Sequence, residues 1–239
     1  MTPDIPVWAV IPAAGIGSRM GGALPKQYLE FQGKTLLEHS LDRLLSHPQI
    51  DGAVLALRND DDRWEQLAYK PAKPLFTTHG GAERQHSVYS GLTTLQYRFG
   101  NDCLALVHDA VRPLVTHAEL DRVIAAARIN QAGAILACPV TDTLKRENQS
   151  MQIESTIPRQ GLWRAQTPQV FHLAPLLNAL KRVIDDDVAI TDDAQAVEMI
   201  GYSPALVAGS TENLKITTPD DLRLAEMIWL NQRDQQYDE

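Results

Sequence analysis

Four short apolar runs recur along the first 140 residues of this 239-residue chain, and helical patterns separate them. The runs lie at 7–11, 53–57, 103–107 and 134–140. Runs of this length that contain β-branched residues are typical of strands buried on both faces of a sheet. Strands that alternate with helices pair in parallel. The sequence therefore predicts an α/β fold, a doubly wound and mostly parallel sheet, in a single domain over residues 1–239.

Three helix starts can be read from local capping patterns. Thr35 with Glu38, and Thr116 with Glu119, have the spacing of a capping box, in which each side chain bonds the backbone of the other residue. The Thr-Pro pair at 218–219 offers an N-cap residue and then the residue favoured at the first helical position. We expect a helix directly after each start.

Composition limits the partners and the location of the protein. A net charge of −8 argues against a nucleic-acid partner, which would require a basic face. No apolar run approaches the ~18 residues of a membrane helix, and no basic-then-apolar leader opens the sequence, so we expect no membrane association and a cytoplasmic location. Cys103 and Cys138 lack paired spacing, and we expect both to be buried free thiols.

The first apolar run is followed by small residues and then by two cationic residues. Gly15 and Gly17 follow the run, and Arg19 and Lys26 come shortly after them. Glycine lets the backbone approach a ligand closely, and anions bind at the carboxyl ends of strands in open α/β sheets. The dinucleotide fingerprint does not fit, because Met20 occupies its third glycine position. The segment predicts a phosphate site of another type.

Further blocks complete a known pattern in order along the chain. The phosphate-site segment itself is the first block of this pattern: it reads Ala-Ala-Gly-x-Gly-x-Arg-Met and is followed by Pro-Lys-Gln. The others are Gly80-Gly81 with Glu83-Arg84 and Ser87-Val88, Val-His-Asp-Ala-Val-Arg-Pro at 107–113, Asp-Thr-Leu-Lys at 142–145, Gln-Thr-Pro-Gln at 166–169, and Leu-Lys-Ile at 214–216. With these blocks the chain closely resembles the 2-C-methyl-D-erythritol 4-phosphate cytidylyltransferases over nearly its whole length.

The resemblance implies a Rossmann-like nucleotidyltransferase fold and a reaction of the non-mevalonate isoprenoid pathway. CMP passes from CTP to 2-C-methyl-D-erythritol 4-phosphate, with Mg²⁺ or another divalent cation as cofactor, and pyrophosphate leaves. Because both reactants are anions, this chemistry needs positioning and cations, and no nucleophilic side chain. Two alternatives stay open: a ribitol-5-phosphate cytidylyltransferase, which shares most of the blocks, and a catalytically silent interaction protein of the same fold.

Residues in the matched blocks become candidates for the site. The resemblance implies four catalytic cations: Arg19, Lys26, Arg159 and Lys215. It implies a further set that binds the substrates: Ala13, Ala14, Gly15, Gly17, Gly81, Arg84, Ser87, Asp109, Arg112, Thr143 and Thr167. Lys215 alternates with apolar neighbours, so we expect it on a strand, pointing away from their face.

The acidic residues differ in their sequence context. Asp109 lies just after the apolar run at 103–107, and the resemblance implies that it sits by the ribose or the Mg²⁺-bound triphosphate, where it is a candidate metal ligand. The aspartate triplets at 60–62 and 185–187 do not follow such runs, so we expect solvated loops there. Asp192 and Asp193 suit the first turn of a helix.

The segment at about 141–158 is polar and breaks the rhythm of strands and helices. Two short alternating stretches flank a turn-like centre, which predicts a protruding β-hairpin. An isolated hairpin is marginal in water, so a projecting one usually packs against something. The resemblance implies that this hairpin is a dimerisation arm of a homodimer, with Thr143 and Arg159 at its two ends supplied to the neighbour's active site.

Overall fold

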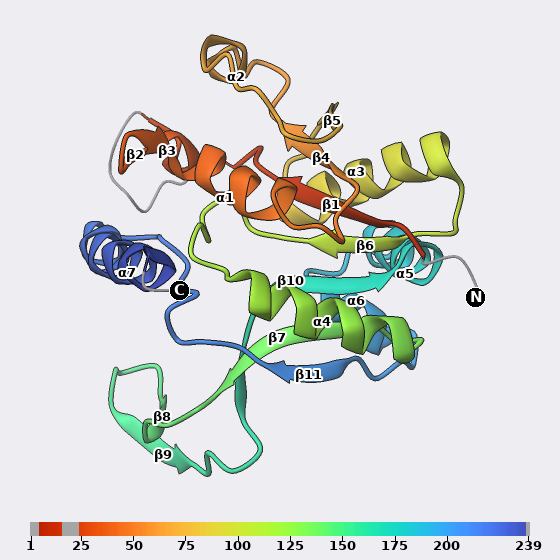
Figure 1. The fold of residues 1–239 in the computed structure, drawn as a ribbon. Coiled ribbons are helices and arrows are strands. Elements are labelled where there is room, and N and C mark those ends of the chain that lie inside the picture. The colour runs from red at the N-terminus through yellow and green to blue at the C-terminus, as the bar shows by residue number, and fades with distance from the viewer. Residues whose placement is uncertain (1–4, 16–23, 238–239) are drawn as a thin grey trace.

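The computed structural model describes residues 5–15 and 24–237, and its centre is a seven-stranded sheet in the order β11-β7-β10-β6-β1-β4-β5 (Figure 1). The strands are β1 (Val7–Pro12), β4 (Gly52–Leu57), β5 (Leu75–His79), β6 (Leu104–Val107), β7 (Ala134–Pro139), β10 (Trp163–His172) and β11 (Ala205–Ala208). Strand β10 runs antiparallel to β6 and β7, and the other neighbours pair in parallel. The predicted doubly wound, mostly parallel sheet is confirmed.

Helices cover both faces of the sheet. Helices α1 (Leu36–Leu45) and α4 (His117–Ile129) lie in front of it in Figure 1, and α3 (Arg84–Phe99), α5 (Leu173–Asp185) and α6 (Asp193–Met199) lie behind it. Strand β1 alternates between these layers: Ala9 packs with α1 and α4, and Val10 packs with α3 and α5. Among the described helices, none has both the length and the apolar composition of a membrane span.

The three expected helix starts are confirmed. Thr35 Oγ1 accepts from the backbone N–H of Glu38 at 3.2 Å, and Glu38 Oε2 accepts from the N–H of Thr35 at 2.7 Å. The same reciprocal bonds form between Thr116 and Glu119 before α4. Helix α7 (Pro219–Tyr237) begins at the expected proline. Local capping chemistry therefore sets where these helices begin.

Smaller elements complete one end of the sheet. They are the 3₁₀ turn η2 (Lys26–Tyr28), the two-stranded β2 (Glu30–Phe31) and β3 (Lys34–Thr35), and the short α2 (Arg63–Gln66). A third apolar cluster joins Phe31, Val111 and Ile216 with Ala225 of α7. This cluster ties α7 and its preceding segment to the loop after β6.

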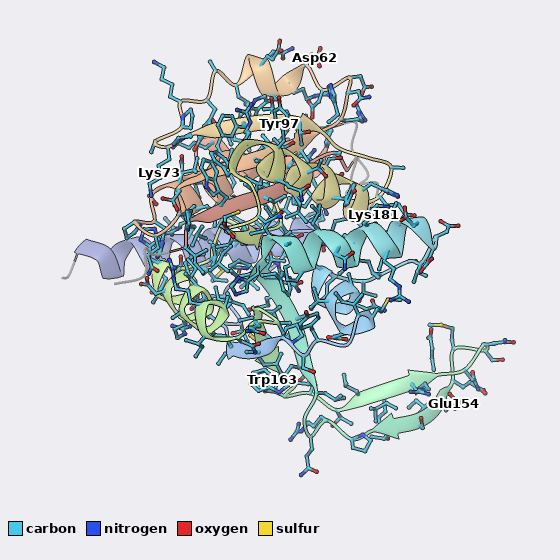
Figure 2. All side chains as sticks on the ribbon, turned by 90° about the vertical axis from the view of Figure 1, so that its right-hand side faces the viewer. Asp62, Lys73, Tyr97, Glu154, Trp163 and Lys181 are labelled. Atoms are coloured by element: carbon cyan, nitrogen blue, oxygen red, sulfur yellow. The ribbon has the colours of Figure 1, made fainter. Side chains whose placement is uncertain are left out.

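Strands β8 (Leu144–Glu147) and β9 (Ile153–Ile157) form an antiparallel hairpin that projects from the body (Figures 1 and 2). Figure 2 shows Glu154 on the hairpin and Trp163 near its base. The hairpin is mostly exposed, including Met151 and Ile153. The predicted hairpin is confirmed, and its part in a dimer stays a prediction. Cys103 and Cys138 are buried and free, as expected.

Candidate functional site

A pocket opens at the carboxyl ends of β1, β5 and β6. Four segments and Lys215 line it: residues 12–15 at the end of β1, 26–27 of η2, 81–84 with Ser87 after β5, and 109–111 after β6. The chain runs from β1 outward to β4 and β5 and then returns to the other side of β1 as β6. Open α/β sheets bind ligands at such a reversal of strand order. The topology therefore places this pocket where a ligand is expected.

Two small-residue loops meet in the wall of the pocket. A Cβ added to Gly80 would lie 2.5 Å from the Cβ of Ala14 and 2.7 Å from Ser87 Oγ, so only glycine permits this approach. The backbone N–H of Gly81 donates to Ser87 Oγ at 3.2 Å. A Cβ added to Gly15, in contrast, meets no described atom within 4 Å. Among the described residues, no side chain or backbone atom therefore crowds Gly15, which lines the pocket.

The carboxylate of Asp109 lies among three cations. Arg84 Nε is 3.1 Å from Oδ1, and Lys215 Nζ is 2.8 Å from Oδ2. Arg112 Nε lies 3.6 Å from Oδ2, while its Nη1 donates to the backbone oxygen of Asn213 at 2.6 Å. Three cations around one anion leave positive charge available to an anionic ligand.

A second carboxylate holds the far side of Arg84. Arg84 Nη1 lies 2.8 Å from Oδ2 of Asp193, the first residue of α6. The side chain of Asp193 is fully buried. Burial alone would lower the pKa of Arg84, but the two carboxylates outweigh it and raise that pKa above its usual range. Burial has the opposite effect on a carboxyl group: it raises the pKa of Asp193, and the charge of Arg84 offsets part of this increase.

The charge of Asp109 is secured by its neighbours. Burial would raise the pKa of Asp109, but Arg84, Lys215 and Arg112 together hold it far below its usual range. Asp109 is therefore a carboxylate at neutral pH.

Behind Asp109, a hydrogen-bonded chain fixes the end of β6. The backbone N–H of Asp109 donates to Thr167 Oγ1 at 3.0 Å, and His108 Nδ1 lies 3.2 Å from the same oxygen. His108 Nε2 lies 3.0 Å from the backbone oxygen of Arg112. Burial lowers the pKa of His108 to about 4, so the ring is neutral and acts as a structural bridge.

A model of the 2-C-methyl-D-erythritol 4-phosphate cytidylyltransferase family matches residues 7–231. The chain belongs to this family. A cytidylyltransferase of that name from Vibrio atlanticus (strain LGP32) is 49% identical over 220 residues, which cover 92% of this chain and 94% of the relative. A crystal structure of a 4-diphosphocytidyl-2C-methyl-D-erythritol synthase superposes with a TM-score of 0.82 at 35% identity, covering 95% of this chain and 100% of that one. The cytidylyltransferase of Francisella tularensis gives a TM-score of 0.80 at 33% identity, covering 93% and 99%.

Most residues that the family resemblance singled out lie together. Those lining the pocket are Ala13, Ala14, Gly15, Lys26, Gly81, Arg84, Ser87, Asp109 and Lys215. Arg112 and Thr167 are buried directly behind Asp109. Gly17 and Arg19 lie outside the described residues.

The expectation that Lys215 lies on a strand is wrong. Residues 214–217 form neither strand nor helix, and the backbone N–H of Ile216 donates to the backbone oxygen of Val111 at 3.0 Å. The expected alternation of side chains between apolar and polar surroundings is nevertheless present. Leu214 and Ile216 pack in the apolar cluster under α7, while Lys215 lines the pocket.

Thr143 and Arg159 are not brought to the pocket within this chain. Both are exposed at the base of the hairpin, and Arg159 Nη1 donates to the backbone oxygen of Thr141. Among the described residues that line the pocket, none comes from the hairpin. Thr143 and Arg159 therefore lie apart from the described lining of the pocket.

The sequence-based prediction missed Gln27, which lines the pocket, and Asp193, which contacts the pocket residue Arg84. Gln27 lines the pocket, and its amide donates to the backbone oxygen of Ala13 at 2.7 Å, which couples η2 to the loop after β1. Its place beside Lys26 in a matched block was the available signal. Asp193 was assigned only to a helix first turn, and nothing in the local pattern indicated its contact with Arg84.

The residues of the pocket fit a metal that arrives on a nucleotide. Within the described residues, no group of three His, Cys, Asp or Glu side chains could hold a metal ion on its own. Mg²⁺ is commonly bound by one or two carboxylates together with substrate phosphates. Asp109 lines the pocket and is charged, so it fits one such ligand.

Proposed function

We propose that this chain transfers the cytidylyl group of CTP to 2-C-methyl-D-erythritol 4-phosphate, which yields 4-diphosphocytidyl-2-C-methyl-D-erythritol and pyrophosphate. One observation carries the proposal: Lys26, Arg84 and Lys215 line a single pocket together with Gly15, in a member of the cytidylyltransferase family. Cations beside a bare backbone turn suit a triphosphate.

In the reaction, a phosphate oxygen of the acceptor attacks the α-phosphorus of CTP. A new P–O bond forms as the bond from the α-phosphorus to the oxygen bridging to the β-phosphate breaks, and pyrophosphate leaves with that electron pair. Negative charge accumulates around the α-phosphorus, so fixed cations lower the barrier. We assign this role to Lys26 and Arg19, and we assign the acceptor phosphate to Lys215.

The remaining pocket residues bind the nucleotide. The loop from Gly81 to Ser87 would contact the cytosine; because Ala82 has no polar side chain, its contacts would come from backbone groups and Ser87. Asp109 would bind the ribose or a divalent cation on the triphosphate, with its position fixed by Arg84 and Arg112. Mg²⁺ is the proposed cofactor, and when bound it would neutralise phosphate charge.

We further propose that residues 1–239 act as one domain of a cytoplasmic homodimer. The hairpin exposes the side chains of Met151 and Ile153 on an element too small to be stable alone. A second copy that covered the hairpin would receive Thr143 and Arg159 close to its acceptor phosphate.

Pyrophosphate release tests the proposal directly. We expect release only when CTP, Mg²⁺ and 2-C-methyl-D-erythritol 4-phosphate are all present. Lys26→Ala should lower kcat by about 100-fold, because loss of one group aimed at transition-state charge costs about 3 kcal/mol. Lys181→Ala is the matched control: Lys181 is exposed on α5 and pairs with Asp185 on the same helix, so kcat should not change. Wild-type kcat in a folded Lys26→Ala variant would refute the assigned role.

A further inference from the structure

Arg84 is shared by two carboxylates that come from distant parts of the chain. Its Nε lies 3.1 Å from Asp109 Oδ1, and its Nη1 lies 2.8 Å from Asp193 Oδ2. Arg84 and Asp109 line the pocket, while Asp193 does not. Among the residues that the structure describes, Asp193 therefore contacts the lining of the pocket through Arg84.

The start of α6 holds Asp193 in a fixed place. Asp192 caps the helix by accepting from the N–H of Gln195 at 3.0 Å. The side chain of Gln169 on β10 bonds both sides of this start: its Nε2 donates to Asp192 Oδ2 at 2.9 Å, and its Oε1 accepts from the N–H of Ala194 at 3.0 Å. Because Asp192 already caps the helix, the helix start does not need the side chain of Asp193.

A fully buried carboxylate is costly unless it meets a counter-charge. Arg84 supplies that charge as an ion pair, and neither carboxylate oxygen of Asp193 has a hydrogen bond of good geometry to a described residue. A guanidinium is a planar fork, so fixing two of its nitrogens fixes its plane. With only Asp109 as a partner, the guanidinium could turn about Nε and follow the negative charge of a triphosphate.

We propose that Asp193 is a positioning residue for the nucleotide site: by holding Nη1 of Arg84, it keeps Nε on Asp109 and so fixes the Asp109 carboxylate where CTP binds. The inference rests on the proposed function for the identity of the ligand. Asp193 does not touch CTP, so its effect on CTP binding depends entirely on Arg84.

A double-mutant cycle tests this dependence. The variants are Asp193→Asn, Arg84→Gln and the double variant, each measured for the Kd of CTP by calorimetry, for kcat and for the KM of both substrates. Asp42→Asn is the matched control, because it removes a carboxylate that also has two partners, Lys34 and Tyr69, but does not line the pocket. Thermal unfolding of each variant reports the structural effect separately.

We expect Asp193→Asn to weaken CTP binding at least tenfold while the KM for the acceptor stays within twofold. In the Arg84→Gln background, the same substitution should change CTP binding less than twofold. Asp42→Asn should leave CTP binding unchanged. An equal loss in both backgrounds would overturn the proposal, as would CTP binding within twofold of wild type for Asp193→Asn.

A second variant keeps the test decisive if Asp193→Asn does not fold. Arg84→Lys retains the charge but replaces the planar fork by a point charge, so we expect it also to lose at least tenfold in CTP binding. Wild-type affinity in Arg84→Lys would overturn the proposal. Calorimetry with CTP needs no turnover, so failure of the wild-type protein to release pyrophosphate would count against the proposed function and leave this comparison valid.

Discussion

Replacing Asp109 by Asn removes the shared anion from a cluster of three cations. Removing one partner of a buried ion pair typically costs 3–5 kcal/mol, because the other charge is left uncompensated. The Lys215 side chain is 37% exposed, so water screens its share. We therefore expect Asp109→Asn to lower the free energy of unfolding at neutral pH by about 3 kcal/mol, which is roughly 6–12 °C in Tm for a chain of this size. Urea unfolding followed by circular dichroism measures it.

The loss of stability in Asp109→Asn should depend on pH in a defined direction. The pKa of Asp109 in the folded protein lies below the value of about 3.9 in an unfolded chain. Its contribution to stability is therefore complete above that unfolded value and is lost as the pH falls toward the folded one. The gap between wild type and Asp109→Asn should narrow between pH 6 and pH 3. An equal gap at both pH values would refute the reasoning.

Three other predictions concern different parts of the molecule. An Arg19→Ala subunit mixed with an Arg159→Ala subunit should recover activity in the heterodimer, because one complete site forms; no recovery after verified subunit exchange would place each site within one chain. The chain should prefer CTP to ATP or GTP in kcat/KM, because the loop from Gly81 to Ser87 lies where the smaller ring would be read, and equal values would contradict this. Thr35→Ala should lower the free energy of unfolding by about 1 kcal/mol through loss of the α1 cap and leave kcat unchanged, as denaturation and rate measurements can check.

The parts of the fold that could be predicted are those specified by local chemistry. Strands β1, β4, β6 and β7 are continuous apolar runs, and the helix starts carry their own capping residues. Strand β10 was not indicated, because its buried positions include the polar residues Gln166, Thr167 and Gln169. Their amides and hydroxyl bond groups from distant segments, so polarity at these positions reflects tertiary contacts and hides the strand.

In the site, too, residues specified by their local sequence could be predicted, and residues defined by distant contacts could not. Gly15 and Asp109 could be located because each lies just after a buried strand, and Lys26 because it stands in a matched sequence block. Asp193 could not, because its partner Arg84 is more than a hundred residues away and the helix dipole explained the carboxylate locally. Alternation alone predicts a strand at Lys215, because it does not distinguish an irregular segment such as 214–217 from a strand paired in a sheet.

The most direct test of the central claim is to compare acceptors in one assay. The purified chain is supplied with CTP and Mg²⁺ and with either 2-C-methyl-D-erythritol 4-phosphate or ribitol 5-phosphate, and products are identified by ³¹P NMR. We predict a new diphosphate diester and an equal amount of pyrophosphate with the methylerythritol phosphate, at a kcat/KM far above that for ribitol phosphate. Faster turnover of ribitol phosphate, or no diester with either acceptor, would contradict the account.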